Sequence, residues 1–192
     1  MKKIMLLILA VFCTANLFAN VIVYKTYQDY VDNKGVSYDE YAGQKEGHLT
    51  VDVSYVFKKG GEKTEIKNTD MWGLKVNDVL FRVFHNGRGS SAGRVMSTGK
   101  VTYYEFGREH IDNVNKGKPD EKIDSDKAWK AISVGLNDPI CWAFFPDDKN
   151  RMNKKDQEYQ KSHPEFEQLY NCIKDHSDVK IIRKCVKDFN GN

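Results

Sequence analysis

Residues 49–57 alternate between apolar and polar side chains, and this period of two constrains the fold more than any other feature of the chain. Successive side chains of a β-strand point to opposite faces, so the alternation predicts a half-buried strand. Similar short runs, separated by turn residues, recur as far as Phe106. Strands spaced so closely predict an antiparallel meander, folded as a small barrel or a roll.

Two dipeptides within this stretch predict tight turns. Gly60-Gly61 separates two alternating runs, and glycine adopts the positive φ of a two-residue hairpin at little cost. Asn77-Asp78 is a second turn pair. The nearly continuous apolar run 79–84 that follows predicts a central strand covered on both faces.

Other positions of the meander have specific predictions. Thr64 is expected to point into the core. Trp72 followed by Gly73 predicts a core anchor at a bend, where the missing Cβ allows close approach. Residues 85–93 are rich in glycine and serine and are expected to form a loop.

The segment before the meander predicts one strand and one short helix. Residues 21–24 are the expected strand, and Thr26 is a suitable helix N-cap with Asp29 three residues later. Gly35 is expected to end that helix. Residues 36–47 are predicted to be irregular, with two tyrosines that pack against the meander or line a binding surface: Tyr38 and Tyr41.

The pattern changes after the meander. Residues 107–127 are polar and predict a long loop, whereas residues 128–145 are apolar and predict two more strands around a turn at Asn137.

Helical periodicity begins only in the C-terminal segment. Ser162 and Glu165 match a capping box, and Asp178 is a suitable cap for a second amphipathic helix. The sequence therefore predicts a single α+β domain over residues 20–192. It combines the antiparallel meander, a short N-terminal helix and a C-terminal helical hairpin at about residues 156–190.

The first nineteen residues are expected to be a secretory signal peptide. Lys2 and Lys3 precede an apolar segment, and small residues suit cleavage after Ala19 or, as a second choice, after Ala15. The residues before Cys13 are too large for a lipoprotein signal. The mature protein is then expected to be secreted or periplasmic and not to span a membrane.

Charge narrows the range of partners. Loss of Lys2 and Lys3 with the signal peptide reduces the formal net charge from +3 to +1. Nucleic-acid-binding proteins usually carry a basic patch or stripe, so this near balance argues against a nucleic-acid partner.

The cysteines predict one disulfide. Export permits disulfides, and we predict a bond between Cys172 and Cys185 in the C-terminal segment. Closing a loop of that length contributes about 3 kcal/mol in the chain-entropy model. Cys141 lies in an apolar run and is expected to be a buried free thiol, because nothing near it in the sequence stabilises a thiolate.

Two patterns have the composition of a chemical site. Residues 89–93 match G-x-S-x-G, but a serine elbow needs a following helix, and another strand is expected there, so Ser91 is not assigned as a nucleophile. The densest group of possible metal ligands matches no standard spacing. We therefore assign no catalytic residue, metal or cofactor, although this group is the best candidate: Glu105, Glu109, His110 and Asp112.

Three short segments are similar to a known group of proteins. Residues 24–30, 70–74 and 99–105 resemble uncharacterised secreted proteins of Bacteroidota-type bacteria. The likeness extends over about residues 21–106. It implies an exported β domain of unknown function and no catalytic residues.

These observations favour a non-enzymatic exported protein that binds an unknown protein or small molecule of the envelope, or that supports the envelope. The expected binding surface combines Tyr38 and Tyr41 with residues 88–91.

Two alternatives stay open. A small-ligand carrier requires a cavity inside a barrel, with the tryptophans either lining that cavity or filling the interior: Trp72, Trp129 and Trp142. A secreted hydrolase would use either acidic residues scattered along the chain or the cluster between Glu105 and Asp112.

Overall fold

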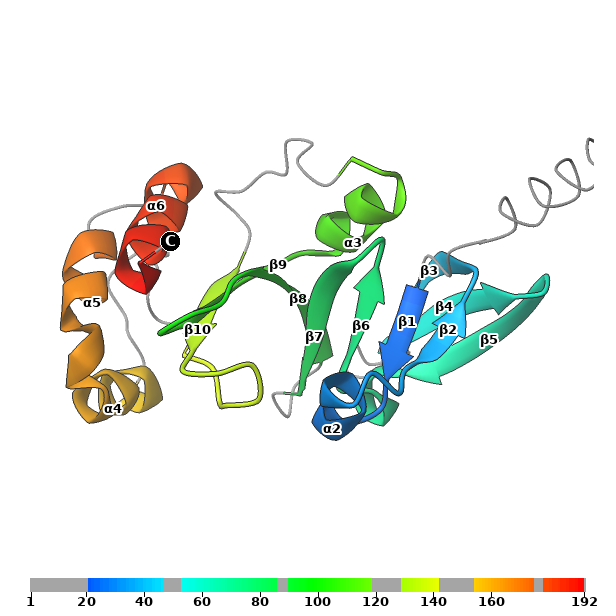
Figure 1. Ribbon diagram of the computed structural model, residues 1–192, viewed down its shortest axis with the longest axis horizontal. Coiled ribbons are helices and arrows are strands. Elements are labelled where there is room, and N and C mark those ends of the chain that lie inside the picture. The colour runs from blue at the N-terminus through cyan, green and yellow to red at the C-terminus, as the bar shows by residue number, and fades with distance from the viewer. Residues whose placement is uncertain are drawn as a thin grey trace, which may run out of the picture.

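The computed structural model describes residues 21–46, 53–85, 90–118, 129–141, 154–174 and 178–191. The predicted signal peptide and its cleavage site lie outside these residues. The described residues form two antiparallel sheets and several helices (Figure 1), which confirms the predicted α+β class.

The larger sheet has seven strands in the order β10-β9-β8-β7-β6-β1-β2, and the smaller has three in the order β3-β4-β5. Strands β6 to β10 are consecutive neighbours, as the meander prediction requires. After β2 the chain enters the smaller sheet, where β3 pairs with β4, so neither sheet closes and the barrel alternative is wrong. The strands are β1 Val21–Tyr24, β2 Val36–Tyr38, β3 Glu40–Glu46, β4 Val53–Lys59, β5 Glu62–Lys67, β6 Gly73–Val76, β7 Val79–His85, β8 Ser90–Ser97, β9 Thr102–Phe106 and β10 Lys130–Ser133.

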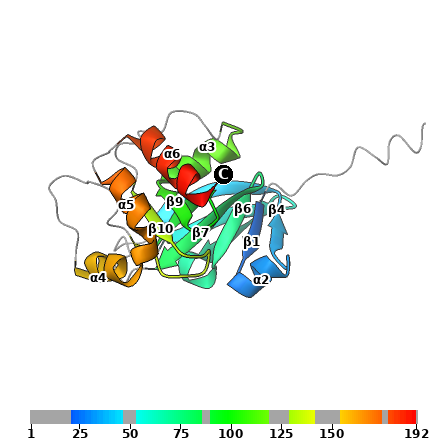
Figure 2. The same cartoon turned by 60° about the vertical axis from the view of Figure 1, so that its left-hand side comes forward.

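The helices lie at three places around the larger sheet. The short helix α2 (Tyr27–Val31) follows β1, and α3 (Arg108–Asn115) follows β9. The other three, α4 (Lys154–Ser162), α5 (Glu167–Ile173) and α6 (Val179–Asn190), gather beside β9 and β10, away from the smaller sheet (Figures 1 and 2). Single 3-10 turns cover Asn68–Asp70 and Pro164–Phe166.

Both predicted hairpin turns are present. Gly60 and Gly61 join β4 to β5 with φ of 58° and 85°, and Asn77 and Asp78 join β6 to β7 with φ of 46° and 66°. Positive φ at both turn residues matches the right-handed twist of the paired strands. The apolar run 79–84 lies in β7, the middle strand of the larger sheet, as predicted.

One hydrophobic core, the inter-sheet core, lies between the smaller sheet and the larger one. Tyr55 and Phe57 of β4 point into it, as the alternation predicts. Thr64 of β5 is exposed, so its predicted inward position is wrong, because β5 is an edge strand with only Ile66 partly covered.

The described part of the stretch 36–47 forms strands β2 and β3 rather than irregular chain, and Gly47 lies outside the described residues. Tyr38 on β2 and Tyr41 on β3 are 7% and 2% exposed, and their rings lie 4.9 Å and 6.2 Å from the Phe57 ring between centroids. Packing against the sheet is therefore the correct interpretation of these tyrosines. They belong to the core and cannot line a binding surface.

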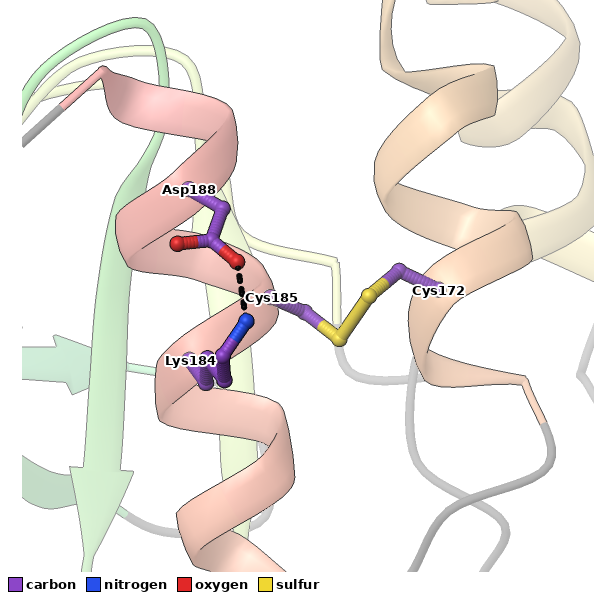
Figure 3. The surroundings of a disulfide bond; sticks show 4 residues. All are labelled: Cys172, Lys184, Cys185 and Asp188. Carbon is purple, nitrogen blue, oxygen red and sulfur yellow. Dashed lines mark hydrogen bonds and ion pairs between the residues drawn. A yellow bond between two sulfur atoms is a disulfide. The ribbon is translucent and has the colours of Figure 1, made fainter.

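A second core, the helix–sheet core, joins α5 and α6 to one face of β9 and β10. Val101, Tyr103 and Ile132 from the sheet meet Leu169 and Ile182 from the helices. Cys172 on α5 and Cys185 on α6 are joined by the expected disulfide, with Cα atoms 5.9 Å apart (Figure 3). Cys141 is fully buried in this core and takes no part in the disulfide.

Asn190, at the end of α6, binds this helix to the β8–β9 hairpin by hydrogen bonds. Its amide accepts a hydrogen bond from the Val101 backbone N–H and donates to the Val101 carbonyl and to Ser97 Oγ, each at 3.0 Å. Gly99 lies against the Asn190 side chain, where a Cβ would clash. The C-terminus of the helical region is therefore held by hydrogen bonds as well as by apolar contact.

Several local predictions about helices are confirmed and others are wrong. The Thr26 capping box is present, but α2 ends at Val31 because Asn33 turns the chain with φ of 54° before Gly35. Asp178 caps α6 by accepting from the Lys180 N–H.

The capping box at Ser162 is wrong. Ser162 is the last residue of α4, and its hydroxyl donates to the Tyr159 carbonyl. The loop predicted after Gly107 is also wrong where the structure describes it, because residues 108–115 form α3, whose only fully apolar anchors are Ile111 and Val114.

Candidate functional site

The carboxylate of Glu105 is the centre of the most unusual polar group in the molecule. Glu105 lies on β9 in the run Thr102–Phe106, in which every residue is buried, and it is 1% exposed. Its Oε1 accepts hydrogen bonds from the Tyr103 hydroxyl at 2.9 Å and from Arg183 Nε at 2.8 Å. Its Oε2 accepts from Arg183 Nη2 at 2.7 Å.

His110, on the first turn of α3, completes this carboxylate cluster. Its Nε2 lies 3.8 Å from Glu105 Oε2, and its side chain is 1% exposed. Neither ring nitrogen has a hydrogen-bond partner among the residues that the structure describes. The carboxylate cluster is defined by Tyr103, Glu105, His110 and Arg183.

The carboxylate cluster lies where the two cores meet. Ala92 and Met96, on the same face of β8, contact the inter-sheet core and the helix–sheet core respectively. Arg94 stands between them on β8 and is directly opposite Glu105, while Lys130 of β10 is opposite Glu105 on the other side. The buried Glu105 carboxylate therefore separates two apolar regions and has cationic residues on both neighbouring strands.

Burial and neighbouring charge shift the pKa of Glu105 in opposite directions. Burial raises the pKa of its carboxyl, but the hydrogen bonds and positive charge of Arg183 and the hydroxyl of Tyr103 outweigh burial and lower the pKa overall. Glu105 is thus ionised at neutral pH. Burial likewise raises the pKa of Tyr103 well above its ordinary value, so its hydroxyl stays protonated and donates to Glu105.

His110 is a neutral histidine at neutral pH. Burial lowers its pKa to about 4, and Arg94 and Arg183 act in the same direction, whereas Glu105 opposes them. A neutral imidazole beside an ionised carboxylate resembles a general-base pair. Here, however, the carboxylate is occupied by Arg183 and Tyr103, and both groups are enclosed, so the arrangement suits attachment of α6 better than turnover.

The predicted group of metal ligands is only partly brought together. Glu105 and His110 meet, but Glu109 is exposed and Asp112 is half-buried further along α3. Within the described residues, no three His, Cys, Asp or Glu side chains gather in a way that could hold a metal ion.

Ser91 is not on a nucleophile elbow. It lies within β8 and pairs with Phe84 of β7, so the strand begins earlier than the predicted loop allows. Residues 86–89, which include two of the four residues of the proposed binding loop at 88–91, lie outside the described residues.

A second feature is a surface of aromatic rings on α2 and before β6. Tyr27, Tyr30 and Trp72 are all partly exposed, and the Trp72 ring lies 5.2 Å and 5.1 Å from the two tyrosine rings between centroids. Lys75 Nζ lies 5.7 Å from the centre of the Tyr30 ring. We call Tyr27, Tyr30 and Trp72 the aromatic surface.

Hydrogen bonds hold the aromatic surface in place. The Trp72 indole N–H donates to Asn137 Oδ1 at 3.0 Å, and Arg82 Nη1 donates to the carbonyl of Asp138 at 2.8 Å. The segment after β10 is thereby fixed against β7 and supports Trp72. Trp72 is thus not the predicted core anchor; Met71 is buried instead, whereas Gly73 allows the predicted close approach, since a Cβ there would clash with the Phe81 carbonyl.

Trp129, the other described tryptophan, does not fill the interior either. Trp129 is 67% exposed, and Trp142 lies outside the described residues. The carrier hypothesis asked whether the tryptophans line a cavity or fill the interior, and neither Trp72 nor Trp129 fills the interior.

Sequence patterns missed Arg183 as the ionic partner of Glu105. A usable signal exists, because a glutamate within the otherwise uncharged strand Thr102–Phe106 requires a buried partner. Sequence alone does not say which of many cations supplies it.

No family model, curated protein or solved structure matches this chain. Of the helices that the structure describes, none is long and apolar enough to cross a membrane.

Proposed function

We propose that this protein is an exported, non-enzymatic binding module of the cell envelope, and that the aromatic surface contacts its partner. The supporting observation is the ring cluster of Tyr27, Tyr30 and Trp72, which stays partly exposed although the chain buries most of its other described tyrosines. Tyrosine and tryptophan are enriched at protein interfaces because they combine a large apolar area with a polar group.

The rigidity of the aromatic surface also supports binding. The Thr26 capping box fixes α2, and Asn137 fixes Trp72. Side chains that are already ordered lose less conformational entropy when a partner binds. Val31, also on α2, is 55% exposed and extends the apolar area.

Binding is favoured over hydrolysis by the state of Glu105. A general acid or base needs a free position for substrate, whereas both oxygens of this carboxylate accept hydrogen bonds from the protein. Export is supported by the Cys172–Cys185 disulfide, since such bonds persist in oxidising compartments.

Mass spectrometry of protein recovered from the envelope fraction of its host tests export. We expect the mass of a chain beginning at Asn20, less two hydrogens for one disulfide. A chain that retains its first nineteen residues, or that carries two free thiols at Cys172 and Cys185, would contradict export.

Binding is tested with the purified protein and an envelope extract of the host. Partners are identified by cross-linking and mass spectrometry, and their Kd is then measured at equilibrium. Replacing Tyr27 and Tyr30 together by serine should weaken binding roughly 30-fold, as the loss of interface hot spots does. The control is Trp129→Ser, which alters an exposed tryptophan outside the aromatic surface and should leave Kd unchanged.

Equal Kd values for the native protein and the double tyrosine variant would remove the aromatic surface from consideration. Substrate turnover by the purified protein would overturn the non-enzymatic assignment.

A further inference from the structure

The carboxylate cluster contains one anion that two side chains from different elements can neutralise. Arg183 on α6 currently binds both oxygens of Glu105, while His110 on α3 lies 3.8 Å away without a hydrogen bond to it. The Arg183 side chain is 41% exposed, whereas Glu105 and His110 are each 1% exposed. Only Arg183 can therefore leave the carboxylate for water without a large movement of the sheet.

We propose that His110 and Arg183 compete for the Glu105 carboxylate, and that proton uptake by His110 releases Arg183 and loosens α6 from the sheet. The proton comes from solvent and binds a ring nitrogen of His110. The imidazolium Nε2–H then donates to Glu105 Oε2, once a small shift closes the 3.8 Å gap. The displaced guanidinium is hydrated at the surface. This inference is independent of the proposed function.

The charges that face His110 explain why Arg183 is the group released. Arg94 of β8 and Lys130 of β10 are the register partners of Glu105, so a charged His110 adds positive charge beside Arg183 where both neighbouring strands already carry a cationic residue. Lys130 is only 6% exposed and Arg94 is half-buried, so both are harder to hydrate than Arg183.

The other charged residues near α3 do not take the place of Arg183 or Glu105 beside His110. α3 packs on β6 and β8, and the one charged residue of β6, Lys75, faces the Tyr30 ring on the opposite face of the sheet from the core residues Leu74 and Val76. Glu109 and Asp112 belong to α3 itself, where Glu109 is exposed and Asp112 half-buried.

The direction of the pH effect follows from linkage. The pKa of His110 is about 4 in the enclosed state, below the value near 6.5 of a histidine in water. The state in which His110 is buried and neutral and Arg183 binds Glu105 therefore keeps its full stability above pH 6.5. It loses stability, relative to the released state, as the pH falls toward 4. With the pKa of a histidine in water assigned to the released state, these two values shift the equilibrium toward release by about 10- to 100-fold between pH 7.5 and 4.5.

Hydrogen exchange of the intact purified protein measures this release. Protection factors of the α6 amides, corrected for intrinsic exchange rates, should fall about 10- to 100-fold between pH 7.5 and 4.5, whereas those of β4 and β5 should not. In the same titration, the NMR signal of the Arg183 Nε–H should change with the same midpoint as the His110 ring.

Three variants identify the groups involved. His110→Gln should abolish the loss of α6 protection, and Arg183→Gln should show low α6 protection at both pH values. His163→Asn is the matched control, because His163 is paired with Glu165 at 2.8 Å near the start of α5 and should not influence the response. A native response in His163→Asn therefore supports His110 as the proton acceptor.

Several results would overturn the proposal. Unchanged α6 protection at pH 4.5, an equal loss in β4 and β5, or a native response in His110→Gln would each do so. If His110→Gln does not fold, different midpoints for His110 and Arg183 in the native protein would still refute the competition.

Discussion

The two cores of this protein are held together in different ways. The inter-sheet core is built mainly from strands that are hairpin neighbours, and apolar and aromatic side chains such as Phe57 fill it. The helix–sheet core joins segments far apart in the chain, through apolar contact, a disulfide and hydrogen bonds that span 78 to 93 residues. Local pattern accounts for the hairpins of the first core, although β1 pairs with β6 and α3 joins this core over longer separations. The second core depends in addition on specific covalent and polar links.

The lengths of the helices explain this difference. α5 has 7 residues and α6 has 12, which is too short for either helix to be stable alone in water. Strands β4 and β5 of the smaller sheet, by contrast, are connected by a two-residue turn and gain stability from adjacent partners. The four predictions below test whether the two cores respond as this comparison requires.

The largest effect is expected in the inter-sheet core. Phe57→Ala should lower the free energy of unfolding by about 3–5 kcal/mol, because a fully buried ring in contact with Tyr38 and Tyr41 is lost and a cavity remains. Urea denaturation measures the change. Thr64→Ala alters the exposed cross-strand partner of Phe57 and should change stability by less than about 0.5 kcal/mol. Equal effects of the two substitutions would show that this core is not the main source of stability.

Removing the disulfide tests the covalent link of the helix–sheet core. Replacing Cys172 and Cys185 by serine should destabilise the protein by about 3 kcal/mol, given their separation of 13 residues. Hydrogen exchange should show the loss mainly in α5 and α6. A loss spread evenly into β4 and β5 would indicate that the two cores unfold as one unit.

Arg183→Gln tests the ionic link at neutral pH. Breaking a buried ion pair costs about 3–5 kcal/mol, but the exposure of Arg183 admits water to the carboxylate, so we expect about 2 kcal/mol. The neighbouring pair Lys184–Asp188 is exposed on the surface of α6 (Figure 3), and Lys184→Gln should have no measurable effect. A loss in Arg183→Gln no greater than that in Lys184→Gln would remove the ionic link from the comparison.

The smallest effect is expected at the end of α6. Asn190→Ala removes three hydrogen bonds to Val101 and Ser97 and should cost about 1–2 kcal/mol in thermal or chemical unfolding. Lys187→Ala, an exposed change in the same helical turn, is the control. No difference between these two variants would mean that apolar contact alone holds this helix end.

Strand positions were accessible from the sequence wherever alternation and turn chemistry agreed. The β4–β5 and β6–β7 hairpins followed from Gly60-Gly61 and Asn77-Asp78, because these residues favour positive φ. The caps at Thr26 and Asp178 were equally local.

Errors occurred where distant contacts outweighed local pattern. Trp72 has the size of a core residue, yet Met71 occupies the core and Trp72 lies on the surface, held by Asn137 from 65 residues away. Residues 108–115 are mostly polar, and they form α3 because Ile111 and Val114 find partners in the inter-sheet core.

The sequence by itself therefore determined the α+β class, the antiparallel hairpins and the cysteines that lie within disulfide distance, because each depends on local periodicity, backbone preference or spacing. Only the tertiary structure decided that both sheets stay open, that Tyr38 and Tyr41 are buried, and that Glu105, His110 and Arg183 meet between two cores. The physical reason is that burial and charge pairing depend on which distant elements pack together. The pKa and the exposed fraction of a side chain are therefore set only by that packing.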